Sequence, residues 1–540
     1  MKLAAIFSDG MILQREKEVY VLGESDKSEE ISIEIDDIRV CSVVRPGRWS
    51  IRLPAHAAGG PYEMVVRGEN VITIKDVLYG EVWLDNGQSN IEFELQNSLG
   101  GMEEVRKADY SDIRYFKAIK APVIDDGFLE EEKKLSWHRC QNGDFLGMSG
   151  IGYFFAQKLH EYLGIPIGIV DCYQGGTSIS CWLEEEILES IPEGESYLKE
   201  FENLTKGQSE EEYLKLLTTY NRMVASHLKR AEEAKRTNPK ITPEELEKVA
   251  GEYPWPPPMG LKSAFRPGGL IETMVKRIAP FTVRGIIYYQ GEEDAERNYE
   301  WIKSEDALND MNYKGMYQKL LEKLAAEYRG LFMEENLPIV VVQLPMYKSR
   351  KDEDVRKWAY IREAQSAVCS ELDSMLLAPL IDLGEYDNVH PVDKKSPGQR
   401  IASEVLLKIY QRNDVGATHM TLSNVSRFSG GVVLNFENTY GGVVLMHNEL
   451  LDIRQENSGV REDHVFGFEI AISQSRTSDD EKSLIWKVPD EIEIDKERVI
   501  IRESREIKEV RYGFFDYGKV NVYNARCVPL APFRVAVSGE

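Results

Sequence analysis

Cysteine and histidine are scarce in this chain, which has six cysteines and eight histidines among 540 residues. None of the cysteines belongs to a Cys-x-x-Cys pair, and no two histidines stand in the His-x-x-x-His spacing. These absences disfavour a zinc site and a disulfide framework, so the sequence predicts no metal and no other cofactor. The cysteines are expected to be reduced and mostly buried: Cys41, Cys140, Cys172, Cys181, Cys369 and Cys527.

Long apolar runs and an excess of positive charge are also missing. No stretch of eighteen apolar residues occurs, which disfavours a transmembrane helix, and Asp9 interrupts the short apolar run near the start, which disfavours a secretory signal peptide. Lys and Arg number 66 against 91 Asp and Glu, which gives a formal charge of −25. Nucleic acids and anionic membranes bind basic surfaces, so neither partner is expected. The cytoplasm is the expected location.

Three common signatures of catalytic or nucleotide-binding proteins are absent. The chain has no Gly-x-x-x-x-Gly-Lys phosphate loop and no Gly-x-Gly-x-x-Gly dinucleotide fingerprint. It also lacks the Gly-x-Ser-x-Gly turn, because Ile91 stands where the second glycine would be. An ordinary α/β-hydrolase is therefore disfavoured.

The sequence patterns that are present divide the chain into three regions. A length of 540 residues predicts two or three domains. Short alternating runs between turns predict an N-terminal β segment over residues 1–75 and a C-terminal β-rich domain over 412–540. Residues 76–411 alternate apolar runs with amphipathic segments, which predicts an α/β domain. Within it, residues 184–258 are rich in helix formers and predict a helical insertion.

Five apolar runs stand out in the α/β region, and each is followed by a polar loop. Continuous apolar runs are typical of strands that are buried on both faces of a parallel sheet. Amphipathic segments between them, for example over 150–164, 317–332 and 360–368, indicate helices that cover an open sheet. The expected strands are VLYGEVWL (77–84), PIGIVDCY (166–173), VRGIIYY (283–289), PIVVVQL (338–344) and LIDLG (380–384).

The loops that follow these strands carry a serine, an aspartate and a histidine. Functional residues of open α/β sheets collect at the carboxyl ends of strands, so Ser89, Asp387 and His390 are expected to converge. A serine hydroxyl is a weak nucleophile that needs a neighbouring base, and the base needs an acid that orients it. The pattern Asp-x-x-His allows one loop to supply both groups. Asp382 is a second candidate for the acid.

The same loops offer groups suited to stabilising an oxyanion. A helix that starts near Ser89 would present backbone N–H groups, Gly175 and Gly176 permit close approach of the backbone, and Gln290 carries an amide. Each feature also has a structural explanation, because serine is a common N-cap and Gly-Gly is common in turns. Their shared position after predicted strands favours the catalytic interpretation.

Four motifs, in order along the chain, resemble those of a known family. GEVWLDNGQSN, GIPIGIVDCYQGGTSISCW, RGIIYYQGEEDA and DNVHP resemble the sialate O-acetylesterase branch of the SGNH hydrolase superfamily. IFSDGMILQREKEVYVLG and HPVDKKSPGQRIA are also similar to this family, so the resemblance covers nearly the whole chain. It implies a flavodoxin-like domain with a parallel sheet, no metal, and hydrolysis of acetyl esters on sugars.

The resemblance also implies a role for each matching residue. The catalytic set would be Ser89 as the nucleophile, His390 as the base and Asp387 as its partner. The oxyanion hole would consist of the backbone N–H groups of Ser89 and Gly176 and the side chain of Gln290. Two further residues would support the nucleophile and the groups around it: Asn90 and Glu292.

Two motifs depart from the family pattern and add carboxylates. Asp85-Asn86 precedes Gly-Gln-Ser, and Glu293-Asp294 follows Gly-Glu, which predicts an acidic rim around the site. An acidic rim favours neutral acetylated oligosaccharides, derived from mannan or xylan, over anionic sugars. O-acetylated sialic acids are the alternative substrate.

A second possible function uses the same fold for binding and catalyses no reaction. The chain would then be a non-catalytic carbohydrate-binding protein in which Trp182, Trp255 and Tyr289 stack on sugars. The presence of the serine, aspartate and histidine argues for the esterase, although a fold alone never establishes an activity. In either case the expected partner is an acetylated sugar or oligosaccharide, and the sequence does not indicate an oligomeric state.

Overall fold

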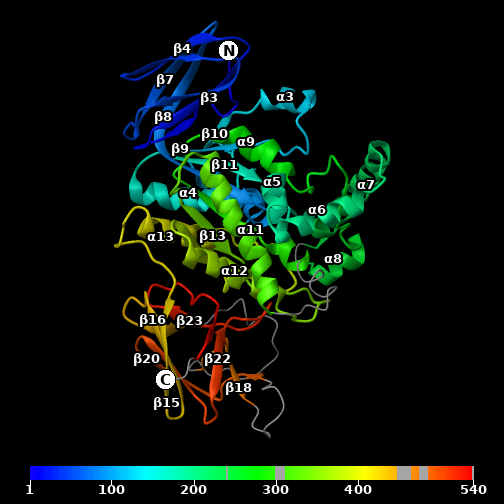
Figure 1. The fold of residues 1–540 in the computed structure, drawn as a ribbon, viewed down its shortest axis with the longest axis vertical. Coiled ribbons are helices and arrows are strands. Elements are labelled where there is room, and N and C mark those ends of the chain that lie inside the picture. Colours follow the sequence, from blue (N-terminus) through cyan, green and yellow to red (C-terminus); the bar gives the residue numbers. More distant parts are fainter. Residues whose placement is uncertain (239–240, 298–309, 447–463, 474–483, 538–540) are drawn as a thin grey trace.

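The computed structural model describes residues 1–238, 241–297, 310–446, 464–473 and 484–537. Figure 1 shows three regions that follow one another along the longest axis of the molecule. A β region that contains the N-terminus lies at one end, an α/β region lies in the middle, and a second β region lies at the other end. The predicted mixed α/β class is confirmed for the middle region.

The N-terminal strands pair antiparallel with one face on a core, except β2, which pairs in parallel with β8. Buried residues alternate with exposed or half-buried ones along β4 and β6, as expected for strands with one solvated face. β3 lies between β1 and β6, and β4 lies between β5 and β7. The bounds are β1 (Lys2–Leu3), β2 (Ile12–Gln14), β3 (Val19–Ser25), β4 (Glu29–Ile35), β5 (Ile38–Val44), β6 (Gly47–Leu53) and β7 (Gly59–Arg67).

One long strand, β8 (Val71–Gly87), joins the N-terminal region to the central sheet. Its first part pairs antiparallel with β7, and from Glu81 onward it pairs in parallel with β11 (Ile167–Tyr173). Residues 77–87 are buried without interruption: residues 78–80 pair with β2, and residues 81–87 lie inside the central sheet. The predicted boundary between residues 75 and 76 therefore falls within one continuous strand.

The central sheet has the strand order β10-β9-β11-β8-β12-β13-β14. All pairings from β9 to β14 are parallel, and only β10 is antiparallel to its neighbour. Every residue of β11, β12 and β13 is buried, which explains the continuous apolar runs in the sequence. The remaining bounds are β9 (Tyr110–Lys117), β10 (Trp137–Cys140), β12 (Gly285–Tyr289), β13 (Ile339–Gln343) and β14 (Met375–Pro379).

The fifth predicted strand was placed too far along the chain. The sequence favoured residues 380–384, whereas β14 ends at Pro379 and residues 380–384 turn away from the sheet. Apolar residues run from Met375 to Leu383 almost without a break, so hydrophobicity alone does not locate the strand. Asp382 consequently lies in the turn after β14 rather than inside a strand.

Two pairs of helices pack in the central region. α4 (Gly150–Leu163) packs against α13 (Lys395–Lys408), and α11 (Asp310–Leu331) packs against α12 (Lys357–Glu371). These helices confirm the predictions for 150–164, 317–332 and 360–368. No helix in the described ranges combines the length and the apolar character needed to cross a membrane. The shorter helical segments are α1 (Ser89–Glu92), η1 (Leu95–Asn97), α2 (Gly101–Lys107), α3 (Asp126–Glu132), η2 (Ile179–Trp182), η3 (Ile271–Val275) and α9 (Lys276–Ile278).

Four helices occupy most of the segment predicted as a helical insertion. The longest projects from the side of the molecule in Figure 1 and begins with a capping box between Ser209 and Glu212. An extended stretch, residues 251–260, then returns the chain toward the central region. The helices are α5 (Glu185–Glu189), α6 (Pro192–Thr205), α7 (Glu210–Thr237) and α8 (Pro243–Ala250).

The C-terminal region contains two four-stranded antiparallel sheets and a strand pair, with a hydrophobic core of its own. Arg362 of α12 ties it to the central region, because its fully buried guanidinium donates hydrogen bonds to the carbonyls of Gly513 and Phe515. The strands are β15 (Thr421–Phe428), β16 (Gly431–Glu437), β17 (Val443–Leu445), β18 (Phe468–Ser473), β19 (Leu484–Lys487), β20 (Glu491–Asp495), β21 (Arg498–Arg502), β22 (Ile507–Tyr512), β23 (Val522–Asn524) and β24 (Phe533–Ala536).

Two carboxyl groups lie side by side inside the central sheet. Asp85 of β8 and Asp171 of β11 are direct partners in the parallel register, and their exposed fractions are 0% and 1%. Burial and the neighbouring charge of Asp171 raise the pKa of Asp85 well above its usual range. Burial raises the pKa of Asp171 to about 6. Asp85 is therefore the protonated member of the pair at neutral pH.

We expect Asp85→Asn to stabilise the protein more at pH 8 than at pH 5. A carboxyl with a raised pKa takes up a proton on folding, so its contribution to stability falls as the pH rises from about 4 toward the folded-state pKa. The variant removes this cost and should raise the thermal unfolding midpoint by a few degrees at pH 8. The measurement is thermal unfolding by circular dichroism at both pH values. Asp109→Asn, at an exposed position, is the control, and an equal loss of stability at both pH values would contradict the expectation.

Candidate active site

A sharp turn at the end of β8 presents Ser89 at the edge of the sheet. Gly87 has φ +134°, and a Cβ atom there would lie 2.0 Å from the carbonyl oxygen of Tyr289 on the neighbouring strand. Glycine thus lets β8 and β12 approach closely just before the chain turns. Helix α1 begins directly afterwards, so Ser89 occupies its first position. The predicted position of this serine, between a strand and a helix, is confirmed.

Ser89 and His390 meet at this edge although 301 residues separate them. The distance from Ser89 Oγ to His390 Nε2 is 2.8 Å, which is a normal hydrogen-bond length. His390 comes from the loop between β14 and α13, and its backbone N–H donates to Asn388 Oδ1. The structure therefore brings together the predicted nucleophile and the predicted base.

The surroundings of His390 keep its imidazole neutral. Burial and the positive charge of Lys394 lower the pKa of His390 to about 4. A neutral ring can accept the hydroxyl hydrogen of Ser89 on Nε2, which is the first requirement for a general base. Serine and histidine are thus arranged for proton transfer.

The two candidate acids have different partners. The carboxylate of Asp387 accepts hydrogen bonds from the backbone N–H of Arg350 at 2.9 Å and from its guanidinium at 3.0 Å. Within the described residues it makes no hydrogen bond to His390. Asp382 accepts two hydrogen bonds from Arg400, at 2.5 and 2.8 Å, and one from the hydroxyl of Tyr523 at 3.1 Å. Asp382 therefore also links the turn after β14 to the C-terminal region.

Two backbone N–H groups near Ser89 are free to bind a substrate oxygen. The N–H groups of Ser89 and Gly176 have no acceptor in the part of the chain that the structure describes. The loop after β11 lies against the nucleophile, because a Cβ atom on Gly175 would be 3.3 Å from Ser89 Cβ. Glu92, one turn after Ser89, holds this loop by accepting the N–H of Gly175 at 2.5 Å. Backbone N–H groups without an acceptor beside a serine are the kind of donor that an oxyanion hole requires.

The side chain of Gln290 is committed to contacts inside the protein. Its amide nitrogen donates to the carbonyl of Thr177 at 3.0 Å, and Gln88 Oε1 and Asp294 Oδ2 lie 3.1 and 2.5 Å away. An amide has only two hydrogens, so none is left for a substrate oxygen in this arrangement. Gln290 instead connects the loops that follow β8, β11 and β12.

Asn90 and Glu292 belong to a buried polar chain beside the nucleophile. The amide of Asn90 donates to Glu292 Oε1 at 2.8 Å, and its oxygen accepts from Lys394 Nζ at 2.7 Å. Burial raises the pKa of Glu292 to about 7 and lowers that of Lys394 to about 7. Lys394 is not among the residues predicted from the sequence, where its only signal is its place four residues after His390 in a recognised motif.

The predicted acidic rim is wrong for Asp85 and Asp294. Asp85 lies inside the sheet against α4, where a Cβ atom on Gly152 would be 2.2 Å from its carboxylate. Its neighbour Asn86 is also buried and donates to the carbonyl of Cys172 at 2.6 Å. Asp294 is fully buried and bonded to Gln290, and burial raises the pKa of Glu293 to about 7. These residues sit at strand ends, but Asp85, Asn86 and Asp294 are buried there and Glu293 is half-buried.

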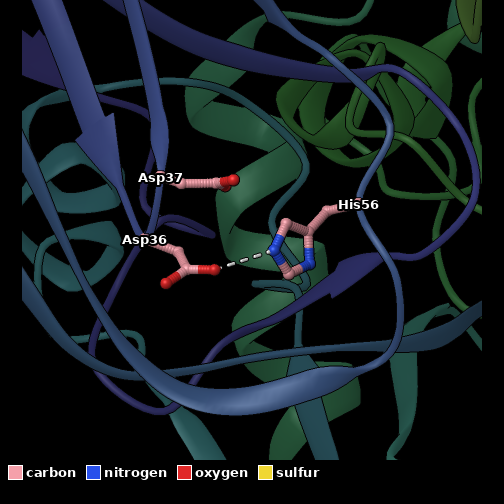
Figure 2. Close-up of side chains that lie close together, drawn as sticks. All are labelled: Asp36, Asp37 and His56. Carbon is pink, nitrogen blue, oxygen red and sulfur yellow. Dashed lines mark hydrogen bonds and ion pairs between the residues drawn. The ribbon is translucent and has the colours of Figure 1, made fainter.

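Among the residues that the structure describes, one group of potential metal ligands occurs, in the N-terminal β region. Figure 2 shows Asp36 and Asp37, at the turn between β4 and β5, beside His56. Their nearest ligand atoms lie within 4.8 Å of one another, and His56 Nε2 is 3.2 Å from Asp36 Oδ2. Both aspartates are exposed and the Asp36–His56 contact accounts for the geometry, so these residues do not by themselves indicate a metal site.

Two of the three aromatic residues that were predicted to stack on sugars are buried and cannot contact a ligand. Trp182 and Tyr289 have exposed fractions of 0% and 2%, because one lies in the core and the other in β12. Trp255 is 46% exposed. Only this tryptophan among the three can contact a ligand.

Part of the chain matches a family model. Residues 261–406 match the model described as "Carbohydrate esterase, sialic acid-specific acetylesterase". The matched range contains Glu292, Asp387 and His390, while Ser89 lies outside it.

Curated relatives carry the same family name. The chain is 23% identical to the sialate O-acetylesterase of Mus musculus over 394 residues, which are 67% of this chain and 64% of that protein. It is 29% identical to the human sialate O-acetylesterase over 147 residues, which are 25% of this chain and 28% of that protein. The match therefore spans less than two thirds of the length of either relative.

A solved structure extends the likeness to the whole chain. A carbohydrate acetylesterase from Xanthomonas citri superposes with a TM-score of 0.70 and 24% identity, covering 99% of both chains. At this identity the comparison shows a shared fold. The resemblance found in the motifs is confirmed: the chain is similar to sialate O-acetylesterases in sequence and to a carbohydrate acetylesterase in fold.

Proposed function

We propose that this protein is a carboxylic ester hydrolase that removes acetyl groups from carbohydrates. The observation that carries the proposal is the 2.8 Å contact between Ser89 Oγ and His390 Nε2, beside two free backbone N–H groups. The names of the relatives support an acetyl ester on a sugar as the substrate. The strand order β11-β8-β12-β13-β14 supports the flavodoxin-like arrangement expected for such a domain.

The geometry supports a two-step reaction. Ser89 Oγ attacks the acetyl carbonyl carbon while His390 Nε2 takes the hydroxyl proton, and the N–H groups of Ser89 and Gly176 stabilise the oxyanion. His390 then gives the proton to the leaving sugar oxygen, which produces the free hydroxyl and an acetyl-enzyme. A water molecule that gives a proton to His390 attacks the acetyl carbonyl carbon, and His390 returns the proton to Ser89 Oγ as acetate leaves.

Asp387 remains the proposed acid partner of His390. It lies three residues before the histidine in the same loop, whereas both oxygens of Asp382 are bound to Arg400 in a link to the C-terminal region. The assignment requires the Asp387 carboxylate to exchange Arg350 for His390 Nδ1. Glu292 and Asn90 are proposed to hold the nucleophile loop through their buried chain to Lys394.

We propose neutral acetylated oligosaccharides, derived from mannan or xylan, as the substrate class. The formal charge of −25 supports a neutral substrate over an anionic one. The loss of the acidic rim weakens this preference, and the family name favours O-acetylated sialic acids as the second candidate. A cytoplasmic location stays a prediction from the sequence.

The first test is acetate release by wild type and Ser89→Ala. The substrates are an acetylated manno-oligosaccharide, an acetylated xylo-oligosaccharide and an O-acetylated sialic acid. Loss of the nucleophile should lower kcat by at least about 10³-fold. Release that survives Ser89→Ala would refute the mechanism, and no release from any substrate would favour the non-catalytic carbohydrate-binding protein.

Asp387→Asn should mainly lower kcat, whereas Asp382→Asn should mainly lower the stability of the fold. Asp387→Asn is expected to lower kcat by about 10²- to 10⁴-fold, because the imidazole loses its acid partner. Asp382→Asn leaves the buried Arg400 without its carboxylate and should mainly lower stability, by about 3–5 kcal/mol. The measurements are kcat at a temperature where both variants are folded, and the thermal unfolding midpoint. Arg350→Gln is the control, and an equal loss of kcat in Arg350→Gln and Asp387→Asn would show that Asp387 acts only by holding Arg350.

The pH profile tests the electrostatic role of Lys394. His390 must be neutral to act as a base, so kcat/KM falls when the pH drops through its pKa. Lys394→Gln keeps a donor for Asn90 but removes the positive charge that lowers the pKa of His390. The acid limb should therefore move to higher pH, while Lys395→Gln, a neighbouring charge change, should shift it less. An acid limb that is the same in wild type and Lys394→Gln would contradict the role.

A further inference from the structure

The indole ring of Trp255 lies directly on the glycine loop of the candidate active site. A Cβ atom on Gly176 would be 2.1 Å from Cη2 of this ring, so the ring occupies the space beside the Gly176 backbone. Gly176 has φ +72°, a conformation that favours glycine as well. The N–H of this same glycine is one of the two groups proposed to bind the oxyanion. Trp255 therefore lies beside the proposed oxyanion site.

The segment that carries Trp255 is anchored on both sides of the ring. Before it, Glu247 of α8 pairs with Arg350 and with Lys351, and Lys351 also pairs with Glu252 at 2.9 Å. After it, Phe265 meets the Trp255 ring edge to face, with 5.9 Å between the ring centres. The ion pairs with Arg350 and Lys351 tie the segment that returns from the helical insertion to the loop after β13. Arg350 of this loop also binds the carboxylate of Asp387.

The ring is nevertheless half open to solvent, with an exposed fraction of 46%. An exposed tryptophan that is fixed in place beside a reaction centre is an unusual use of a large apolar side chain. Pyranose rings present one face made of C–H groups, and that face packs on flat aromatic rings. Aromatic side chains also lose little conformational entropy when they bind.

We propose that Trp255 is the carbohydrate platform of this protein and a determinant of its substrate specificity. A pyranose ring stacks on the exposed part of the indole, and the acetyl group that this sugar or its neighbour carries then reaches Ser89. The platform recognises the sugar and not the ester, so it acts on sugar esters and contributes little to small esters without a sugar. This inference rests on the proposed function, because it concerns the substrate of the same site.

The kinetic test compares two substrates with and without the platform. For wild type and Trp255→Ala we would measure kcat/KM with an acetylated xylo-oligosaccharide and with 4-nitrophenyl acetate. The ratio of the first value to the second should fall by about tenfold in Trp255→Ala, mainly through KM, and Trp255→Phe should recover part of it. A parallel loss with both substrates, or no loss, would overturn the inference.

Tyr253→Ala is the matched control. Tyr253 is also 46% exposed and lies two residues before Trp255, but its ring meets His227 of α7. The control should leave the ratio unchanged. An equal change of the ratio in the control would mean that any loosening of the segment produces the effect, which would also overturn the platform.

A binding experiment separates the platform from the chemistry. Xylotetraose and mannotetraose, which carry no ester, are titrated by calorimetry into Ser89→Ala and into Ser89→Ala with Trp255→Ala. About tenfold weaker binding by the double variant would support the platform. This holds even if the wild type releases no acetate, a result that would refute only the proposed esterase function. Equal binding by the two variants, or no binding to Ser89→Ala, would overturn the platform. The esterase function would still hold if acetate release depends on Ser89.

Discussion

The second half of β8 is the constraint on which the rest of the structure depends. Residues 81–87 are paired in parallel with β11 on one side, and residues 83–87 with β12 on the other, so this segment has no free edge and no exposed face. The buried segment ends at Gly87, because there the chain passes close to the carbonyl oxygen of Tyr289 and only glycine fits. The position of Ser89 follows from that ending. The same two pairings place the loop after β11, with Gly175 and Gly176, and the loop after β12, with Gln290.

Burial also sets the electrostatics around this edge. The lowered pKa of His390 and the raised pKa of Glu292 have the same first cause, which is the removal of charged groups from water. Lys394 couples the two residues, because it repels a proton on His390 and reaches Glu292 through Asn90. The neutral base is thus a property of the packed site and not of the histidine alone.

Much of this arrangement could be predicted from the sequence, because the carboxyl ends of parallel strands must meet at one edge. That rule placed Ser89 and His390 together from strand patterns alone. It could not tell which way a side chain points, so Asp85 and Asp294 were expected at the rim although both are buried. Nor could it find Lys394 or separate β14 from the apolar turn that follows, since both depend on contacts between distant segments.

The helical insertion has a consequence for how such proteins diverge. The strand ends hold the groups proposed for ester hydrolysis, whereas Trp255 lies on a segment, residues 251–260, that forms no strand of the sheet. Changes in residues 251–260 can therefore accumulate without disturbing β8, β11 or β12. If the proposals hold, the reaction and the choice of sugar depend on separate stretches of the chain, and one can change in evolution or by engineering while the other stays intact.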